Sequence, residues 1–177
     1  HYLDGSLDIH AFLEFALRPL AEHPTQRLKA WRRRFVAEKI QPIVLPAARA
    51  LVARHRHNGD LPVIITATNQ FITAPIAKLL GVDHLLATVP EQKNGRYTGR
   101  VTGTPTFREG KILALEAWLS ETGHDLSGSW FYSDSHNDIP LLERVTHPVA
   151  VDADPQLRAH AQRHGWRILS LREPPAA

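Results

Sequence analysis

The stretch Val-Ile-Ile-Thr-Ala-Thr-Asn at residues 63–69 decides the fold of this chain. Three β-branched apolar residues are followed at once by hydroxyl and amide side chains, a pattern typical of a buried strand, over 63–66, that ends in a polar loop. Apolar residues then recur at helical spacing over 71–80, Gly81 stops the helix, and a second apolar run occupies 84–88. Strand, helix and strand in this order predict a parallel β-α-β unit.

The same alternation continues toward the carboxyl terminus. We expect a hairpin of two short runs around 96–102, helices over 108–122 and 155–164, and strands over 130–133, 148–151 and 166–171. Short apolar strands separated by helices predict an α/β fold with a mostly parallel sheet between helices.

The first 41 residues have a different character. Apolar residues recur at helical spacing in two runs between residues 8 and 41, which predicts an antiparallel pair of helices without a strand. Pro24 and Thr25 separate the runs, and Thr25 is the expected cap of the second helix. Pro42 and Pro46 then interrupt the helical pattern, and we place a boundary between 1–41 and 42–177 there.

Composition excludes several classes of function. The chain has 177 residues without cysteine or methionine, so disulfides and thiolate chemistry are excluded for it. Lysine and arginine total 21 against 18 acidic residues and are interleaved with them, so we expect no nucleic acid partner, and we interpret Arg32–Arg34 as a solvated helix face. No apolar run approaches the ~20 residues of a membrane span. We expect a cytoplasmic protein, and the sequence does not indicate its oligomeric state.

Polar residues that directly follow the apolar runs are the candidates for chemistry, because the carboxyl ends of parallel strands share one edge of a sheet. Thr66 and Asp134 take such places, and Lys111 stands at the start of the helix after residues 107–110. The stretch Ser-Asp-Ser-His-Asn-Asp at 133–138 puts two carboxylates, Asp134 and Asp138, four residues apart, where both can face a divalent cation. Each residue alone has an ordinary alternative, such as a turn, a helix cap, a strand end or a solvated lysine.

The order of these residues resembles the haloacid dehalogenase superfamily, in its phosphoserine-phosphatase-like branch. The second motif of that branch is a Ser or Thr after a strand, the third a Lys and the fourth a paired-acid D-x-x-x-D, which match Thr66, Lys111, Asp134 and Asp138. The resemblance implies a Rossmann-like core over 42–177 and assigns 1–41 to part of a helical cap.

The resemblance also implies roles for individual residues. Thr66 and the backbone N–H of Ala67 would bind a phosphoryl oxygen, and Lys111 would neutralise the phosphate. Asp134 would bind Mg²⁺, while Asp138 would bind it too or orient Asp134 and Lys111. Thr66, Lys111 and Asp138 are therefore the expected catalytic residues.

Two more residues are candidates for contact with the substrate. Arg108 and Asn137 lie beside the third and fourth motifs, and we assign both to substrate binding. Arg108 has two possible partners, a substrate carboxylate or a neighbouring acid, and the sequence does not rank them.

The first motif of the family, D-x-D-G-T, is not found. Asp4-Gly5 resembles it, but Tyr2 stands where the nucleophilic aspartate belongs, so we interpret this stretch as a turn. We expect a core that lacks its first strand, with that strand and both its aspartates on an amino-terminal segment outside these residues.

These observations predict an enzyme, a Mg²⁺-dependent phosphomonoester hydrolase that acts on a small phosphorylated metabolite, such as phosphoserine or histidinol phosphate, through an aspartyl-phosphate. The alternative is a non-catalytic relic that binds phosphate or a partner. A phosphoacceptor receiver domain fits less well, because its acidic residues precede its Thr and Lys whereas here the paired acids come last.

Overall fold

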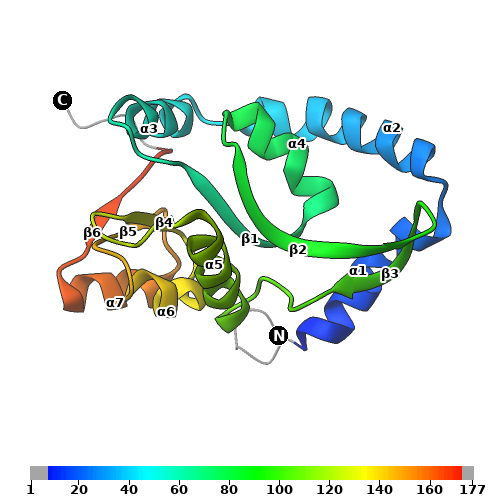
Figure 1. Cartoon of the computed structure of the whole chain (residues 1–177). Coiled ribbons are helices and arrows are strands. Elements are labelled where there is room, and N and C mark those ends of the chain that lie inside the picture. The colour runs from blue at the N-terminus through cyan, green and yellow to red at the C-terminus, as the bar shows by residue number, and fades with distance from the viewer. Residues whose placement is uncertain (1–7, 173–177) are drawn as a thin grey trace.

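The computed structural model describes residues 8–172 (Figure 1). Its elements, in chain order, are α1 (Ile9–Glu22), α2 (Thr25–Phe35), the short π and 3-10 turns Val36–Ile40 and Gln41–Ile43, α3 (Pro46–His57), β1 (Val63–Asn69), α4 (Gln70–Leu80), β2 (His84–Lys93), β3 (Arg96–Thr102), α5 (Glu109–Thr122), β4 (Trp130–Ser133), the 3-10 turn His136–Asp138, α6 (Ile139–Leu142), β5 (His147–Val151), α7 (Pro155–His164) and β6 (Arg167–Leu169). No helix in this range is long and apolar enough to cross a membrane. The Asp4-Gly5 turn lies outside the described residues.

The strands form two sheets of three, in the orders β1-β2-β3 and β4-β5-β6. β1 pairs with β2 in parallel, and β4, β5 and β6 are parallel to one another, so the predicted α/β alternation is confirmed. The predicted hairpin is wrong in detail. Residues 96–102 form one strand, β3, which pairs back on the far half of β2 across the turn at Asn94 and Gly95. The sequence pattern predicted a strand only over 84–88, because the last residues of β2 are polar and exposed.

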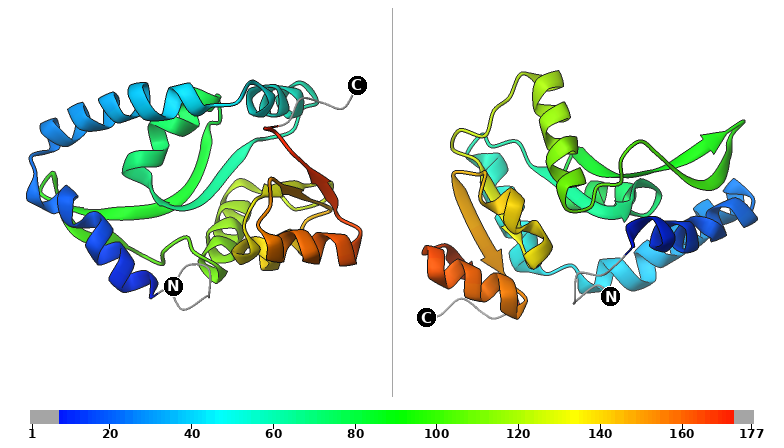
Figure 2. Two further views of the ribbon diagram at one scale, coloured as in Figure 1. Left: turned by 180° about the vertical axis from the view of Figure 1, so that it is seen from behind. Right: turned by 90° about the horizontal axis from the view of Figure 1, so that it is seen from below.

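The sheet β4-β5-β6 has a dense core on one face. α6 and α7 pack there (Figure 2), and Leu142, Ala150, Leu157 and Ala161 have no exposed surface. Burial of aliphatic side chains of this kind stabilises a fold by about 1.5–3 kcal/mol for each large side chain. This half of the molecule therefore provides a rigid base for the loops at the carboxyl ends of its strands.

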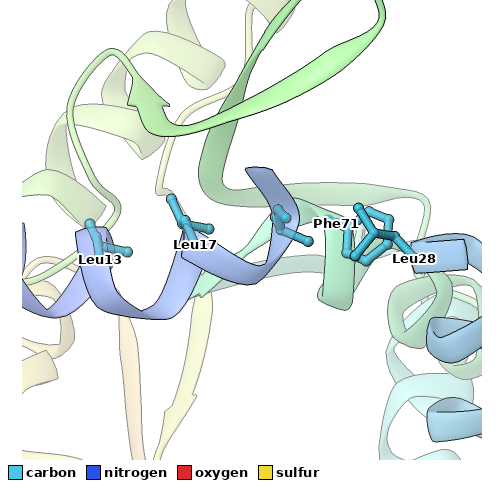
Figure 3. Packing of buried hydrophobic residues seen from close by; sticks show 5 residues of the cluster. Leu13, Leu17, Leu28 and Phe71 are labelled. Carbon is cyan, nitrogen blue, oxygen red and sulfur yellow. The ribbon is translucent and has the colours of Figure 1, made fainter. Parts of the chain in front are cut away.

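A second core joins the first helices to the hairpin. Leu13, Leu17 and Leu20 of α1 meet Leu28 of α2 and Phe71 of α4 (Figure 3), and Tyr97 and Val101 of β3 pack against this cluster.

The expected antiparallel helical pair is wrong, because α1 packs chiefly on β3 and diverges from α2 (Figure 1). Thr25 does not cap α2 either. Its hydroxyl donates to the carbonyl of Gly95, 3.2 Å away, and so ties the start of α2 to the hairpin turn.

An apolar cavity of about 490 Å³ lies between β1 and β4. Residues 63–65 line it on one side, residues 130–132 on the other, and Leu51 and Leu115 add to its wall. Neither facing edge is paired with a strand from residues 8–172. Helix α3 contacts the second sheet, since Nε2 of its His55 lies 2.7 Å from the hydroxyl of Tyr132 in β4.

Candidate active site

The end of β4 carries a buried ion pair. Nζ of Lys111 lies 2.6 Å from Oδ1 of Asp138, with side-chain exposures of 13% and 7%. The other carboxylate oxygen of Asp138 accepts a hydrogen bond from the hydroxyl of Ser133 at 2.7 Å. A buried pair with further hydrogen bonds is fixed in geometry, because moving either group leaves a charge without compensation. The ammonium of Lys111 is thus held beside Asp138, close to the carboxyl end of β4.

The backbone before Lys111 is specialised for this placement. A Cβ at Gly110 would lie 1.9 Å from the carbonyl oxygen of Pro105, so only glycine lets the first turn of α5 approach that segment. Arg108 has φ +49° and ψ −118°, a conformation that costs a non-glycine residue on the order of 1–3 kcal/mol. Its Nε donates to Oδ1 of Asn137 at 3.0 Å, which brings together the two residues expected to contact substrate.

Asp134 differs from Asp138 in its surroundings. Its carboxylate is exposed and makes no hydrogen bond or ion pair with residues 8–172. These residues also hold no group of three or more His, Asp or Glu side chains placed for a metal ion. Mg²⁺ commonly binds through one or two carboxylates and takes its other ligands from water and phosphate. A free carboxylate at a strand end fits that pattern, whereas both oxygens of Asp138 are already engaged.

The end of β1 carries no charge. The hydroxyl of Thr66 accepts a hydrogen bond from the backbone N–H of Thr68 at 3.1 Å, and Asn69 caps α4 through the N–H of Ile72. Thr66 and Ala67 lie on the other sheet, β1-β2-β3. Within residues 8–172, no hydrogen bond joins either residue to Lys111 or Asp138. The structure therefore joins Lys111 to Asp138 and Arg108 to Asn137, leaves the carboxylate of Asp134 without a bond from residues 8–172, and places Thr66 and Ala67 on the other sheet.

Three residues of the site were missed or given no role. Thr88 is 1% exposed, and its hydroxyl donates to the carbonyl of Ala67 and accepts from the N–H of Thr106, so it joins the end of β1 to the segment before α5. Ser133 was part of the quoted motif but had no assigned partner. Asp154 was visible as a helix-starting Asp-Pro pair, which signals a cap and nothing more.

Asp154 lies against the loop that carries Asp134. Its carboxylate accepts hydrogen bonds from the backbone N–H groups of Leu157 and His136 and from the ring of His136. Burial raises the pKa of Asp154, but these hydrogen bonds lower it by more, so the pKa lies below its ordinary value. The group is therefore ionised at neutral pH.

Comparison with known proteins shows the family of this chain. The model of the haloacid dehalogenase-like hydrolase family matches residues 3–143. A histidinol-phosphatase of Neisseria meningitidis serogroup C is 43% identical over 97% of this chain and 79% of its own length. A phosphoserine phosphatase of Mycobacterium tuberculosis is 32% identical over 96% of this chain, which spans 55% of that relative. The chain belongs to the haloacid dehalogenase-like hydrolase family, in its phosphoserine-phosphatase-like branch.

Solved structures agree on the fold. A Bordetella pertussis protein described as of unknown function has a TM-score of 0.92 at 47% identity and covers 96% of this chain, which covers 78% of it. A phosphoserine phosphatase solved as a phospho-aspartyl intermediate analogue has a TM-score of 0.68 at 20% identity over 96% of this chain and 76% of its own. The second likeness shows the Rossmann-like fold alone. The family and fold expected from the sequence are confirmed.

Proposed function

We propose that this protein is a Mg²⁺-dependent phosphomonoester hydrolase that transfers the phosphoryl group of a small metabolite to an aspartate and then to water. The observation that carries the proposal is the buried Lys111–Asp138 pair, fixed by Ser133 beside the free carboxylate of Asp134. A phosphate ester resists attack because its negative charge repels a nucleophile, and this rim offers one positive charge and one place for a cation.

The residues near the carboxyl ends of β4 and of β1 have different roles. Lys111 neutralises the phosphoryl oxygens, and Asp138 holds its ammonium in place. Asp134 is the carboxylate that holds Mg²⁺, which lowers the charge of the phosphate when it is bound. Thr66 and the N–H of Ala67 donate to a phosphoryl oxygen from the second half of β1, where its pairing with β2 is irregular. Arg108 and Asn137, joined to each other, bind the remainder of the substrate.

The nucleophile belongs to a strand that residues 8–172 do not contain, and we place that strand in the cavity between β1 and β4. Neither edge that faces the cavity is paired with a strand from residues 8–172, and both edges carry apolar side chains, so a parallel apolar strand would fit between them. An aspartate at its carboxyl end would then lie between Thr66 and Asp134. This position suits a nucleophile that forms an aspartyl-phosphate.

The substrate is a small phosphorylated metabolite, with histidinol phosphate and phosphoserine as the two candidates. The first is supported by the 43% identical histidinol-phosphatase, and the second by the 32% identical phosphoserine phosphatase. The segment of α1, α2 and β3 lies away from the sheet β4-β5-β6 (Figure 1), and we assign residues 1–41 to a cap that selects between such substrates. The cytoplasmic location stays a prediction.

The experiment is a hydrolysis assay of the full-length natural protein. We expect it to release phosphate from an aryl phosphate with Mg²⁺ and to lose at least ~10³-fold of that rate in excess chelator, because the site neutralises charge through a cation. The values of kcat/KM for histidinol phosphate and phosphoserine then decide the substrate. Full activity in chelator contradicts the proposal, and no activity in either condition favours the non-catalytic relic.

A further inference from the structure

The loop at 134–138 carries the free carboxylate of Asp134, and its inner side is held by its own residues. Ser133 Oγ accepts from the N–H of Ser135 at 3.1 Å while it donates to Asp138, and the N–H of Asp138 donates to the carbonyl of Ser135 at 3.0 Å. None of these bonds fixes the carbonyl of Asp134 itself or the N–H of His136. Those two groups face the loop between β5 and α7.

Asp154, in that loop, makes both of the missing contacts. Its N–H donates to the carbonyl of Asp134 at 2.8 Å. Its Oδ2 accepts from the N–H of His136 at 2.7 Å and from Nδ1 of the same residue at 2.8 Å. The main chain is thereby held on both sides of Ser135, directly after the Asp134 carboxylate.

Helix capping does not account for this arrangement. Asp154 caps α7 with Oδ1 alone, which accepts from the N–H of Leu157 at 2.8 Å, and Asn69 caps α4 in the same way with one oxygen. Ser or Asn would serve as well at such a position. The second oxygen of Asp154 accepts from two donors on His136, and that needs an acceptor-only group at both oxygens.

The loop that holds Asp154 is itself anchored. Asp152 has φ +46°, its carboxylate accepts from the hydroxyl of Ser170 at 2.6 Å, and its N–H donates to the carbonyl of Leu169 at 3.0 Å. Val151, immediately before it, lies at the end of the buried strand β5. Asp154 therefore connects the Asp134 loop to a fixed part of the core.

We propose that Asp154 is a positioning residue for the cation site: it fixes the backbone on both sides of Ser135 so that the Asp134 carboxylate stays where Mg²⁺ binds. This inference rests on the proposed function, in which Asp134 holds the ion. Groups that orient a metal ligand without touching the metal typically change affinity or activity by about 10–100-fold when they are removed.

The test measures binding of Mn²⁺ to the full-length protein by electron paramagnetic resonance of the free ion. Asp154→Ser keeps an oxygen that can cap α7 and removes the one that bonds His136. We expect the Mn²⁺ Kd to rise ~10-fold or more, with the Mg²⁺ concentration for half-maximal activity rising in parallel and the KM for substrate at saturating Mg²⁺ little changed. His136→Ala keeps its backbone bond to Asp154, so we expect a smaller rise of about 3-fold.

The matched control is Asp125→Ser. Asp125 also accepts a backbone N–H, that of Ser127 at 2.7 Å, but it lies in an exposed loop before β4, and we expect no change in Mn²⁺ Kd. A folded Asp154→Ser with the wild-type Kd overturns the inference. If that variant does not fold, an unchanged Kd in His136→Ala overturns it instead. A wild-type protein that binds no Mn²⁺ and needs no Mg²⁺ removes the proposed function, which is a separate outcome.

Discussion

The strands β1 and β5 both contain a run of apolar residues, yet these runs differ in burial. Val149 and Ala150 of β5 have no exposed surface, while Val63, Ile64 and Ile65 of β1 are all partly exposed. β5 lies between two paired strands, whereas β1 has a partner on one side and the cavity on the other. A strand this apolar is typical of the interior of a parallel sheet. This difference is the one we expect if the strand that we propose lies beside β1.

The residues near the carboxyl ends of β1 and β4 differ as well. The rim at β4 has Lys111, Asp134 and Asp138, while the rim at β1 offers the uncharged donors of Thr66 and Ala67. Because a charge in a partly buried site acts more strongly than a neutral hydrogen bond, the two rims should contribute unequally to catalysis. The following changes separate their contributions.

The largest effect is expected at Lys111. Lys111→Ala removes a positioned charge that acts on the transition state, and kcat/KM should fall by at least ~10²-fold, or about 3 kcal/mol. Lys111→Arg should not restore it, because a planar guanidinium does not replace a compact ammonium between two anions. Steady-state kinetics of the full-length protein checks both.

The stability of the Lys111 variants must be measured together with kcat/KM. Lys111→Ala also leaves Asp138 buried without its partner, which destabilises a fold by about 3–5 kcal/mol where no other group compensates. Lys111→Met combined with Asp138→Asn removes both charges and should regain part of this loss without regaining activity. Lys78→Ala, on the exposed side of α4, is the control and should leave the rate unchanged. Near-normal turnover by Lys111→Ala contradicts the assignment of the charged rim.

The next change compares burial directly in two valines. Val149→Ala should lower the free energy of unfolding by about 2 kcal/mol, because the side chain is fully buried. Val63→Ala should cost about as much in the full-length protein if a strand occupies the cavity, and about half as much if the edge is open. Denaturant unfolding of both variants measures the difference. A clearly smaller cost at Val63 would argue against the strand that we place there.

The smallest effect is expected at the uncharged rim. Thr66→Val keeps the shape of the side chain and removes its hydroxyl, so kcat/KM should fall by about 10-fold, less than for Lys111→Ala. Stability should change little, because within residues 8–172 the hydroxyl accepts one hydrogen bond, from the N–H of Thr68 two residues away. Thr122→Val, at the exposed end of α5, is the matched control. A loss at Thr66 as large as that at Lys111 would mean that the two rims do not differ as their charges suggest.

Part of the candidate site could be predicted from the sequence, because each of its motifs spans only a few residues. An apolar run followed by a polar residue marks a strand end, and this reasoning selects Thr66 and Asp134. Lys111 lies in the first turn of α5, after the antiparallel strand β3, so its contact with Asp138, 27 residues away, comes from tertiary packing. The same reasoning left the role of Asp138 open between metal ligand and support. The engagement of both its oxygens by Lys111 and Ser133 favours support.

The role of Asp154 could not be predicted in this way. Its cap on α7 is encoded within three residues and can be read from Asp-Pro, whereas its bonds to Asp134 and His136 join loops about 20 residues apart. Hydrogen bonds between loops leave no periodic signal, since neither hydrophobic spacing nor turn chemistry depends on them.

The sequence by itself determined the α/β alternation, the order of the motif residues and the family that they resemble, because spacing and strand-end chemistry act over a few residues. Tertiary structure decided that α1 packs on β3, that the sheet is divided beside β1, and that Asp154 supports the Asp134 loop. These features depend on which surfaces meet after the chain has folded. That choice is made by the fit of side chains far apart in sequence, which local pattern does not encode.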